Sequence, residues 1–509
     1  MEINSENRSF VTELVLLDTV AEQLADVDLT LPDYCPDIEK ILKCTLTPNI
    51  QTKSLSGGQL QIDGFCTVNV LYIEKERKTV RCCEQNVNFS QSFSVRDTPE
   101  NYAVVTRTKP EYINCRALSP RRLVIRGAFS LYAKVIATDK TNIFMPSGDQ
   151  LEVLKKSLRI ADLKAFCQEQ FTFSEEISAA DKPAIESILY SKLSANITDS
   201  KAVSGKLMIN GEINLCLFYL SGVESGETSK LDYILPFNQI IDCDGVDENT
   251  INLISCEVMS YDLRLKNDML SEKPAIAVDV KLCLTEEGYL SEETQIAVDA
   301  YSLDYASQPR FENLKTVSEA VPVSESFMEK LSVSVDSGKI SKILDIFAED
   351  VTLETVPENG SLKAGGRINL CMLALDENET PMFVERVCEY SHVLASAEGC
   401  DSLIFPNARA AGISYRLSDD NAAEIRCELK ISGGALKNEV NRALSGIEVF
   451  EDQPLEGDSC ALTLYFARRG ESLWEIAKAH KTRLSLLQAE NAQDELATER
   501  AGMLLIPKI

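Results

Sequence analysis

The chain has 509 residues, 44% hydrophobic and 26% charged, with a net charge of −28. This length predicts three or four domains of about 150 residues each, and the composition is typical of a soluble globular protein. The negative charge argues against nucleic acid and anionic lipid as partners, because their phosphates would be repelled. No stretch approaches 18 apolar residues and no basic, apolar leader begins the chain, so we expect neither a transmembrane segment nor secretion.

The cysteine and histidine content disfavours several kinds of chemistry. Sixteen cysteines occur without a C-x-x-C pair, which favours free, buried thiols in a reducing compartment over zinc ligands or disulfides. The two histidines, His392 and His480, leave little room for imidazole catalysis. No G-x-x-x-x-G-K-[ST], G-x-S-x-G or H-E-x-x-H motif is present, so we expect no catalytic residues, no metal and no cofactor.

A short motif occurs three times, as LPDYCPDIEKIL (31–42), DKPAIESIL (181–189) and DSGKISKIL (336–344). Each copy places an isoleucine three residues before an adjacent Ile-Leu pair: Ile38 before Ile41-Leu42, Ile185 before Ile188-Leu189, and Ile340 before Ile343-Leu344. The spacing, with Pro36 and Pro183 suited to a first helical turn, predicts a short helix with one apolar stripe. We expect this helix to cover the sheet that follows it.

An alternating segment follows each motif at the same distance. The three segments are GQLQIDGFCTVNVLY (58–72), GKLMINGEINLCLFY (205–219) and GSLKAGGRINLCMLA (360–374). Alternation of this length predicts a half-buried strand, with a bend at the central glycine, Gly64, Gly211 or Gly366. The polar face carries Asn69, Cys216 and Cys371 at one register, which favours a buried second face or packing niche over a metal site.

Hairpins with polar tips complete each repeat, and a last alternating strand ends it at 122–135, 273–284 and 423–432. We therefore expect a mainly β protein with short helices, built from three tandem β-rich domains of which the third is divergent. The expected bounds are 1–148, 149–310 and 311–447, followed by an acidic linker at 448–460 and a small domain at 461–509.

The charge composition changes in the last 49 residues, which carry seven Lys/Arg and six Asp/Glu. Ser472 and Glu475 form a capping box that starts a helix, and a second short helix begins at Leu484. The run YFARRGESLWEIAKAHKTRLSLLQAEN…LLIP resembles a LysM module, a β-α-α-β fold. The matching positions are Tyr465, Gly470, Glu471, Ser472, Leu473, Trp474, Ile476, Ala477, Leu484, Leu487, Asn491, Ile506 and Pro507. Lys481 and the placement of Gly502 depart from the usual pattern.

The LysM resemblance implies a shallow groove for N-acetylglucosamine-containing glycans. Its residues here would be Gly470, Glu471, Ser472 and Leu473 on one side and Asn491, Ala492 and Gln493 on the other. The alternative is that these residues serve turn and cap geometry alone. Five nearby cations could face a partner or form a solvated surface: Arg468, Arg469, Lys478, Lys481 and Arg483.

The repeats themselves resemble the SPOCS-type repeat of endospore-forming bacteria, and a series of them ending in LysM is similar to the SipL-like family of spore coat morphogenetic proteins. The resemblance implies a mother-cell cytoplasmic adaptor at the forespore surface. Its partners would be the ATPase of the coat's basement layer and other coat proteins, contacted through LysM. Binding of peptidoglycan or a lipid-linked precursor through LysM is the alternative. A cell-wall hydrolase is disfavoured, because the sequence shows no catalytic constellation.

Overall fold

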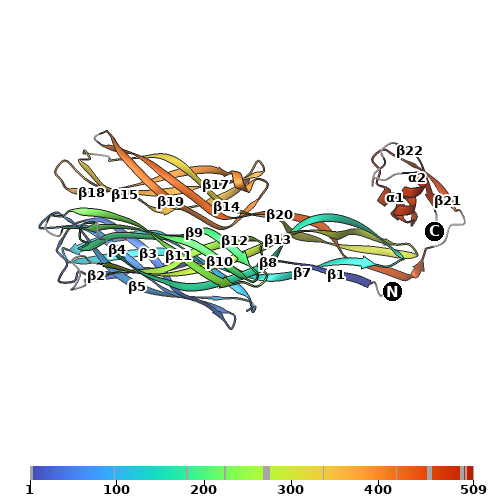
Figure 1. Ribbon diagram of the computed structural model, residues 1–509, viewed down its shortest axis with the longest axis horizontal. Coiled ribbons are helices and arrows are strands. Elements are labelled where there is room, and N and C mark those ends of the chain that lie inside the picture. The colour runs from blue at the N-terminus through green and yellow to red at the C-terminus, as the bar shows by residue number, and fades with distance from the viewer. Residues whose placement is uncertain are drawn as a thin grey trace.

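The computed structural model describes residues 4–96, 98–178, 182–222, 225–266, 275–335, 338–419, 421–455, 461–492, 498 and 501–507. Three long β-sandwiches lie side by side and taper into one stalk, whose far end carries a small C-terminal module (Figure 1). The N-terminus lies near that same end. The expected fold class, mainly β with repeated β-rich units and short helices, is confirmed. Within the described residues, no helix has the length and apolar character needed to cross a membrane.

Each repeat is built from two antiparallel sheets. In repeat 1, β1 (Asn4–Leu24), β2 (Val27–Thr30), β6 (Tyr102–Ser119) and β7 (Arg122–Ser147) form one sheet, and β3 (Ile38–Ser56), β4 (Gln59–Glu74) and β5 (Val80–Ser94) form the other. In repeat 2, β8 (Leu151–Ser178), β12 (Ile251–Lys266) and β13 (Ala275–Ser302) face β9 (Ser187–Val203), β10 (Lys206–Leu220) and β11 (Thr228–Asp242).

Repeat 3 keeps this order with one interrupted strand. Its first sheet contains β14 (Tyr305–Ser334), β19 (Ser402–Asp419) and β20 (Ala422–Pro454); its second contains β15 (Lys342–Val351), β16 (Glu354–Glu358), β17 (Ser361–Leu375) and β18 (Pro381–Leu394), followed by the 3₁₀ turn Ala395–Ala397. The segment expected as an acidic linker is strand as far as Pro454, because β20 pairs there with the start of β14.

The described residues of the three motif copies form no helix, so the predicted helices are wrong: strand begins at Ile38, Ser187 and Lys342, and the described residues before these points are turn or irregular. Each Ile-Leu pair lies near the start of a strand and marks a β-bulge, whose extra residue is Leu42, Leu189 or Leu344. In the first copy a further bulge, at Glu39, gives Ile38 and Ile41 the three-residue spacing that resembled a helix, whereas Ile185 and Ile340 lie before their strands begin. In the first two copies, the carbonyl of Pro36 and that of Pro183 accept hydrogen bonds of 3.2 Å from the Tyr72 and Tyr219 hydroxyls.

The bulge leucines join the three repeats to one another. They belong to one cluster that also contains Leu71, Val80 and Cys82 of repeat 1, Tyr190, Phe218 and Leu220 of repeat 2, and Leu373 and Phe383 of repeat 3. The isoleucine of each pair packs instead into the core of its own sandwich. The motif therefore recurs because each repeat needs one residue for its own core and one for the shared core.

The central glycines lie where the sequence predicted a bend. A Cβ on Gly64, Gly211 or Gly366 would come within 2.1 Å of the Asn49 carbonyl oxygen, 2.3 Å of Phe237 or 1.9 Å of the Thr352 carbonyl oxygen, respectively. The cross-strand partners of these glycines are Phe89, Phe237 and Tyr390. An aromatic ring thus covers each bare backbone, as in aromatic rescue of strand glycines.

The stalk consists of the long ends of three strand pairs, β1–β7, β8–β13 and β14–β20. Their inward side chains form a core of their own, with Phe10, Ile143, Met145, Leu151, Leu158, Ile160, Ile296, Ala297, Ala300, Leu314, Ala443, Leu444 and Ile447. Cysteines of the described ranges are free thiols, buried or half-buried.

Candidate functional site

The C-terminal module has the order β21 (Leu462–Ala467), α1 (Leu473–His480), α2 (Leu484–Asn491) and β22 (Gly502–Pro507), with the two strands antiparallel. The Ser472 side chain caps α1 by accepting from the Glu475 backbone N–H at 3.4 Å. Both helices end in a left-handed residue, Lys481 and Ala492. The module has a small core made of Leu473, Trp474, Ile476, Ala477, Leu487, Leu504 and Ile506.

The first predicted groove segment is held by a residue that the sequence did not single out, Thr498. The Gly470 N–H donates to the Thr498 carbonyl at 2.8 Å, and the Glu471 N–H donates to the Thr498 hydroxyl at 3.1 Å. The Glu471 carboxylate accepts from the Tyr465 hydroxyl at 2.6 Å and from the Arg468 N–H at 2.9 Å. These bonds, the Tyr465 one foremost, lower the pKa of Glu471. Nothing in the sequence distinguishes Thr498 from the other polar residues near it.

The second predicted groove segment is fixed by Asn491. Its amide nitrogen donates to the Leu487 and Leu505 carbonyls at 2.8 and 2.7 Å, and its amide oxygen accepts from the Leu505 N–H at 2.7 Å. Ala492 is exposed, and Gln493 lies outside the described residues. Leu473 is buried. In this structure, Ser472 caps α1, Leu473 lies in the core of the module, and Asn491 links α2 to β22.

The module is seated on the tip of the stalk through Asp299 and Tyr301 of β13 (Figure 1). The Trp474 indole N–H donates to the Asp299 carboxylate at 2.7 Å, and the Tyr301 hydroxyl donates to the Thr482 carbonyl at 2.5 Å. The Tyr301 and Trp474 rings lie 5.0 Å apart. Burial raises the pKa of Tyr301, which keeps its hydroxyl a donor.

Three of the five predicted partner-facing cations contact the stalk. Lys478 pairs with the Asp299 carboxylate at 2.7 Å, the Lys481 ammonium lies 5.6 Å from the Tyr301 ring centre, and Arg483 donates to the Asp149 carbonyl at 3.0 Å. Arg468 and Arg469 are exposed at the end of β21. Of these five cations, Arg468 and Arg469 are therefore the two best placed to contact a partner.

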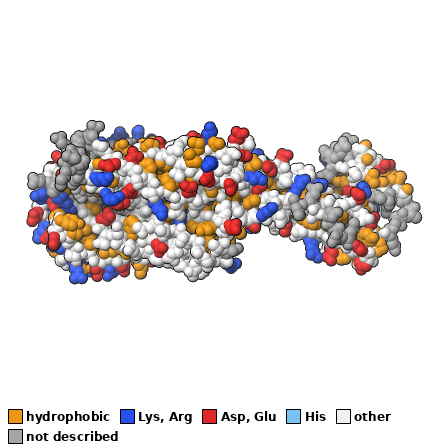
Figure 2. Space-filling model, turned by 60° about the horizontal axis from the view of Figure 1, so that its bottom comes forward, with side chains coloured by type: hydrophobic (Ala, Val, Ile, Leu, Met, Phe, Trp, Pro, Cys, Tyr) orange, Lys and Arg blue, Asp and Glu red, His pale blue; other side chains and the backbone are white. Residues whose placement is uncertain are grey.

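The outer face of the β21–β22 ribbon is apolar and uncovered. Leu462, Leu464, Phe466 and Met503 are 50%, 64%, 62% and 58% exposed. Phe466 pairs across the ribbon with Met503, and Leu464 pairs with Leu505. Figure 2 shows the narrow stalk that separates this module from the bulk of the sandwiches. The apolar ribbon is thus presented at one end of an elongated molecule.

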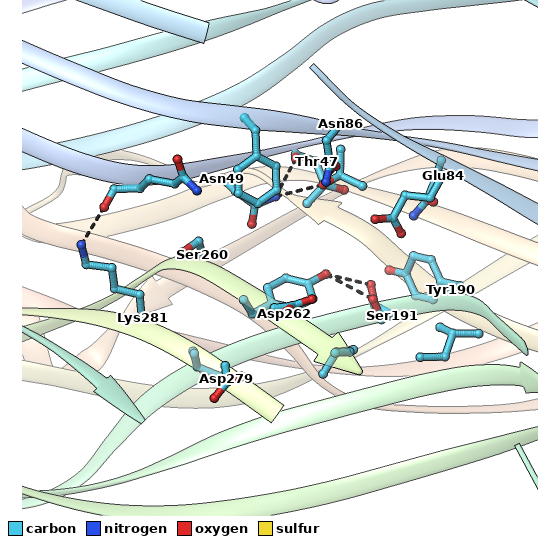
Figure 3. A pocket seen from close by; sticks show the side chains of 18 of the residues that line it. Thr47, Asn49, Glu84, Asn86, Tyr190, Ser191, Ser260, Asp262, Asp279 and Lys281 are labelled. Atoms are coloured by element: carbon cyan, nitrogen blue, oxygen red, sulfur yellow. Dashed lines mark hydrogen bonds between the residues drawn. The ribbon is translucent and has the colours of Figure 1, made fainter. Parts of the chain in front are cut away.

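A second candidate site is a polar cavity of about 500 Å³ between repeats 1 and 2 (Figure 3). Repeat 1 contributes Asn49, Asn86 and Glu84, and repeat 2 contributes residues that include Tyr190 and Asp262. At the cavity's edge, Lys281 donates to the Gln51 carbonyl at 2.6 Å. Burial foremost, and then the nearby Asp262 charge, raise the pKa of Glu84.

The register that carries Asn69, Cys216 and Cys371 lies at the junctions between repeats. Cys371 is fully buried, and its sulfur and the Glu349 and Glu385 carboxylates lie within 4.8 Å of one another. Lys43 of repeat 1 forms ion pairs with both carboxylates, at 3.0 Å in the case of Glu349. The Lys43 ammonium group therefore already neutralises the Glu349 and Glu385 carboxylates.

The comparisons with known proteins agree with the repeats. The family model described as SipL, SPOCS domain, matches residues 37–118 and 184–266, which correspond to β3 through β6 and β9 through β12. Searches of curated proteins and of solved structures each gave no significant match. Repeat 3 carries the same strand order as the two matched repeats. The chain therefore contains two regions that match the SipL SPOCS domain, and this match relates it to sporulation and the spore coat.

Proposed function

We propose that this chain is a non-enzymatic adaptor of spore coat morphogenesis and encasement, which binds the coat's basement-layer ATPase and other coat proteins. It would act in the mother-cell cytoplasm, at the surface of the forespore. The SPOCS match supports the sporulation setting. The observation that carries the docking role is the uncovered apolar ribbon of the C-terminal module, which resembles LysM.

The ribbon has the properties of a protein-docking face. Contiguous apolar patches are uncommon on soluble proteins and often mark interaction sites. Both free edges of a two-stranded ribbon can also accept an added strand from a partner. Arg468 and Arg469 lie at the end of β21, so an apolar partner segment that carries acidic residues would fit the ribbon and the charges together.

Co-purification of the basement-layer ATPase with the full-length chain tests this role. Replacing Phe466 and Leu464 by serine should reduce retention at least about tenfold, since each truncation of a central apolar anchor costs on the order of 1–2 kcal/mol. Leu118→Ser, at a residue 55% exposed on β6, is the matched control and should retain the ATPase. Unchanged retention by the double variant, with native tryptophan fluorescence, would rule out the ribbon as the docking face.

Glycan binding by the same module is the second candidate function. The β-α-α-β order is that of LysM, and Gly470 and Ala492 are exposed in the two segments that would border the groove. Cosedimentation of the full-length chain with insoluble peptidoglycan tests it, with Gly470→Asp as the variant and Gly446→Asp in β20 as the control. Enrichment of wild type and control but not of Gly470→Asp supports glycan binding, and no enrichment of any form excludes it for mature peptidoglycan.

A further inference from the structure

The three repeats meet at three junctions that use equivalent positions. On one side of each junction stands a cross-strand pair, Asn69–Glu84 in repeat 1, Cys216–Asp232 in repeat 2 and Cys371–Glu385 in repeat 3. On the other side stands the residue directly after the bulge leucine of the next repeat: Tyr190, Asp345 and Lys43, respectively. Every junction thus contains a carboxylate at the same place in its sheet.

A lysine of the chain neutralises that carboxylate at two junctions. Between repeats 2 and 3, the Lys230 ammonium lies 3.2 Å from Asp345 and 3.9 Å from Asp232. Between repeats 3 and 1, Lys43 pairs with Glu385 and lies 3.0 Å from Glu349. Partly buried carboxylates are stabilised by such a charge partner.

The junction between repeats 1 and 2 has the carboxylate without the lysine. At the position where repeat 2 has Lys230, opposite Phe218, repeat 1 has Cys82, opposite Leu71. At the position directly after the bulge leucine, where repeat 1 has Lys43, repeat 2 has Tyr190. Among the described residues, none forms an ion pair with Glu84. Asn69, Cys82, Glu84 and Tyr190 all line the polar cavity, so the space opens at the place where the other junctions hold an ammonium group.

The rest of the lining suits an elongated organic cation. Figure 3 shows Glu84, Asp262 and Asp279 at separate places along the cavity. Arg264 contacts both Asp262, at 3.1 Å, and Asp279, which also accepts from the Ser174 hydroxyl at 2.6 Å. The rings of Phe65, Tyr190 and Tyr261 line the same space. Aromatic faces and carboxylates together attract alkylammonium groups, because the ring quadrupole adds to the charge attraction.

We propose that this cavity binds a linear polyamine, with one primary ammonium at Glu84, the carboxylate that no cation of the described chain pairs with, and the rest of the molecule along the rings of Tyr190 and Tyr261. The bound ammonium takes the place that Lys230 and Lys43 hold at the other junctions. Binding would therefore join repeats 1 and 2 more firmly. The inference does not depend on the docking role of the C-terminal module.

Isothermal titration of the full-length chain with spermidine at low salt tests the proposal. Wild type should bind one equivalent in a saturable step, and Glu84→Gln should weaken binding at least about tenfold, since charge-assisted hydrogen bonds contribute about 1.5–3 kcal/mol. Glu293→Gln, at an exposed stalk residue, changes the net charge equally and should leave binding unchanged. Spermidine should also raise the melting temperature of wild type but not that of Glu84→Gln.

Two outcomes would overturn the proposal. The first is equal binding by wild type and Glu84→Gln, which would show diffuse attraction to an acidic protein. The second is equal affinity for spermidine and for Nα-acetyl-lysine methylamide, which carries one ammonium, because a single cationic group would then suffice. A Glu84→Lys variant provides a further check: its own ammonium should abolish the saturable step, and persistence of the step would place binding elsewhere.

Discussion

Trp474 and Asp299 are joined by a buried hydrogen bond of 2.7 Å, although 175 residues separate them in the chain. The same carboxylate accepts from Lys478. One acidic side chain at the end of β13 thus fixes α1 of the C-terminal module to the stalk. The direction in which the module presents its apolar ribbon depends on this contact.

Asp299→Ala should release the module from the stalk. The change leaves the indole N–H and the Lys478 ammonium without their partner, which costs about 3 kcal/mol for a buried pair. Trp474 is the chain's single tryptophan, so its fluorescence reports the contact directly. We expect a red-shifted emission and stronger acrylamide quenching without denaturant. Glu293→Ala on the same strand is the control, and an identical spectrum for the two variants would contradict the docking role of Asp299.

The sequence predicted the strands well, because alternation over fifteen residues has a simple physical cause, one buried face of a sheet. It failed at the strand that precedes each of them. Ile38 and Ile41 face the core of repeat 1 although they are three positions apart, since a bulge inserts Glu39 between them. A bulged strand and one turn of helix leave the same apolar spacing, and only the paired strand distinguishes them.

The bulge leucines should contribute to stability according to their burial. Leu189 is 3% exposed, whereas Leu42 and Leu344 are half-buried. Leu189→Ala should therefore lower the free energy of unfolding by about 2–5 kcal/mol, and the other two alanine variants by less. Urea unfolding measures the difference. Equal effects of all three variants would show that the cluster between the repeats does not pack as a common core.

Alanine at the central strand glycines should destabilise the protein through a backbone clash. Gly366→Ala would place its Cβ 1.9 Å from the Thr352 carbonyl oxygen, so the backbone at Thr352 would have to move to make room for it. We expect a loss of about 1–3 kcal/mol or more, as in overpacked cores. Gly446→Ala in β20 is the matched control, because no atom lies within 4 Å of its added Cβ. A loss as large in the control as in Gly366→Ala would exclude the clash as the cause.

The stalk, the module's seat and the polar cavity could not be read from the sequence. Each is formed by residues from different domains, such as Glu84 with Tyr190 or Asp299 with Trp474, and no local pattern encodes which surfaces of two domains face each other. The paired cysteine register was the one local sign. Cys216 and Cys371 occupy positions that alternation assigns to solvent, and the structure places them at junctions between repeats.

Glu287 should make the protein less stable as the pH rises. It is fully buried in β13, and burial foremost, with the Glu13 charge second, raises its pKa from 4.5 to about 7. Tyr289, whose hydroxyl donates to Glu287 at 2.6 Å, and Lys134 offset part of this shift. The neighbouring Glu286, with both carboxylate oxygens unpaired, has its pKa raised well above 4.5, chiefly by burial.

The sign follows from proton counting, because between pH 4.5 and 7 the folded chain holds a proton on Glu287 that the unfolded chain has lost. The contribution of Glu287 to the free energy of unfolding is therefore fully present below pH 4.5. It is lost as the pH rises through 7, which lowers the free energy of unfolding by up to about 3 kcal/mol. Glu287→Gln should flatten the fall in melting temperature between pH 5 and pH 8, and Glu293→Gln should not. Parallel curves for wild type and Glu287→Gln would show that this carboxyl group titrates normally in the folded protein.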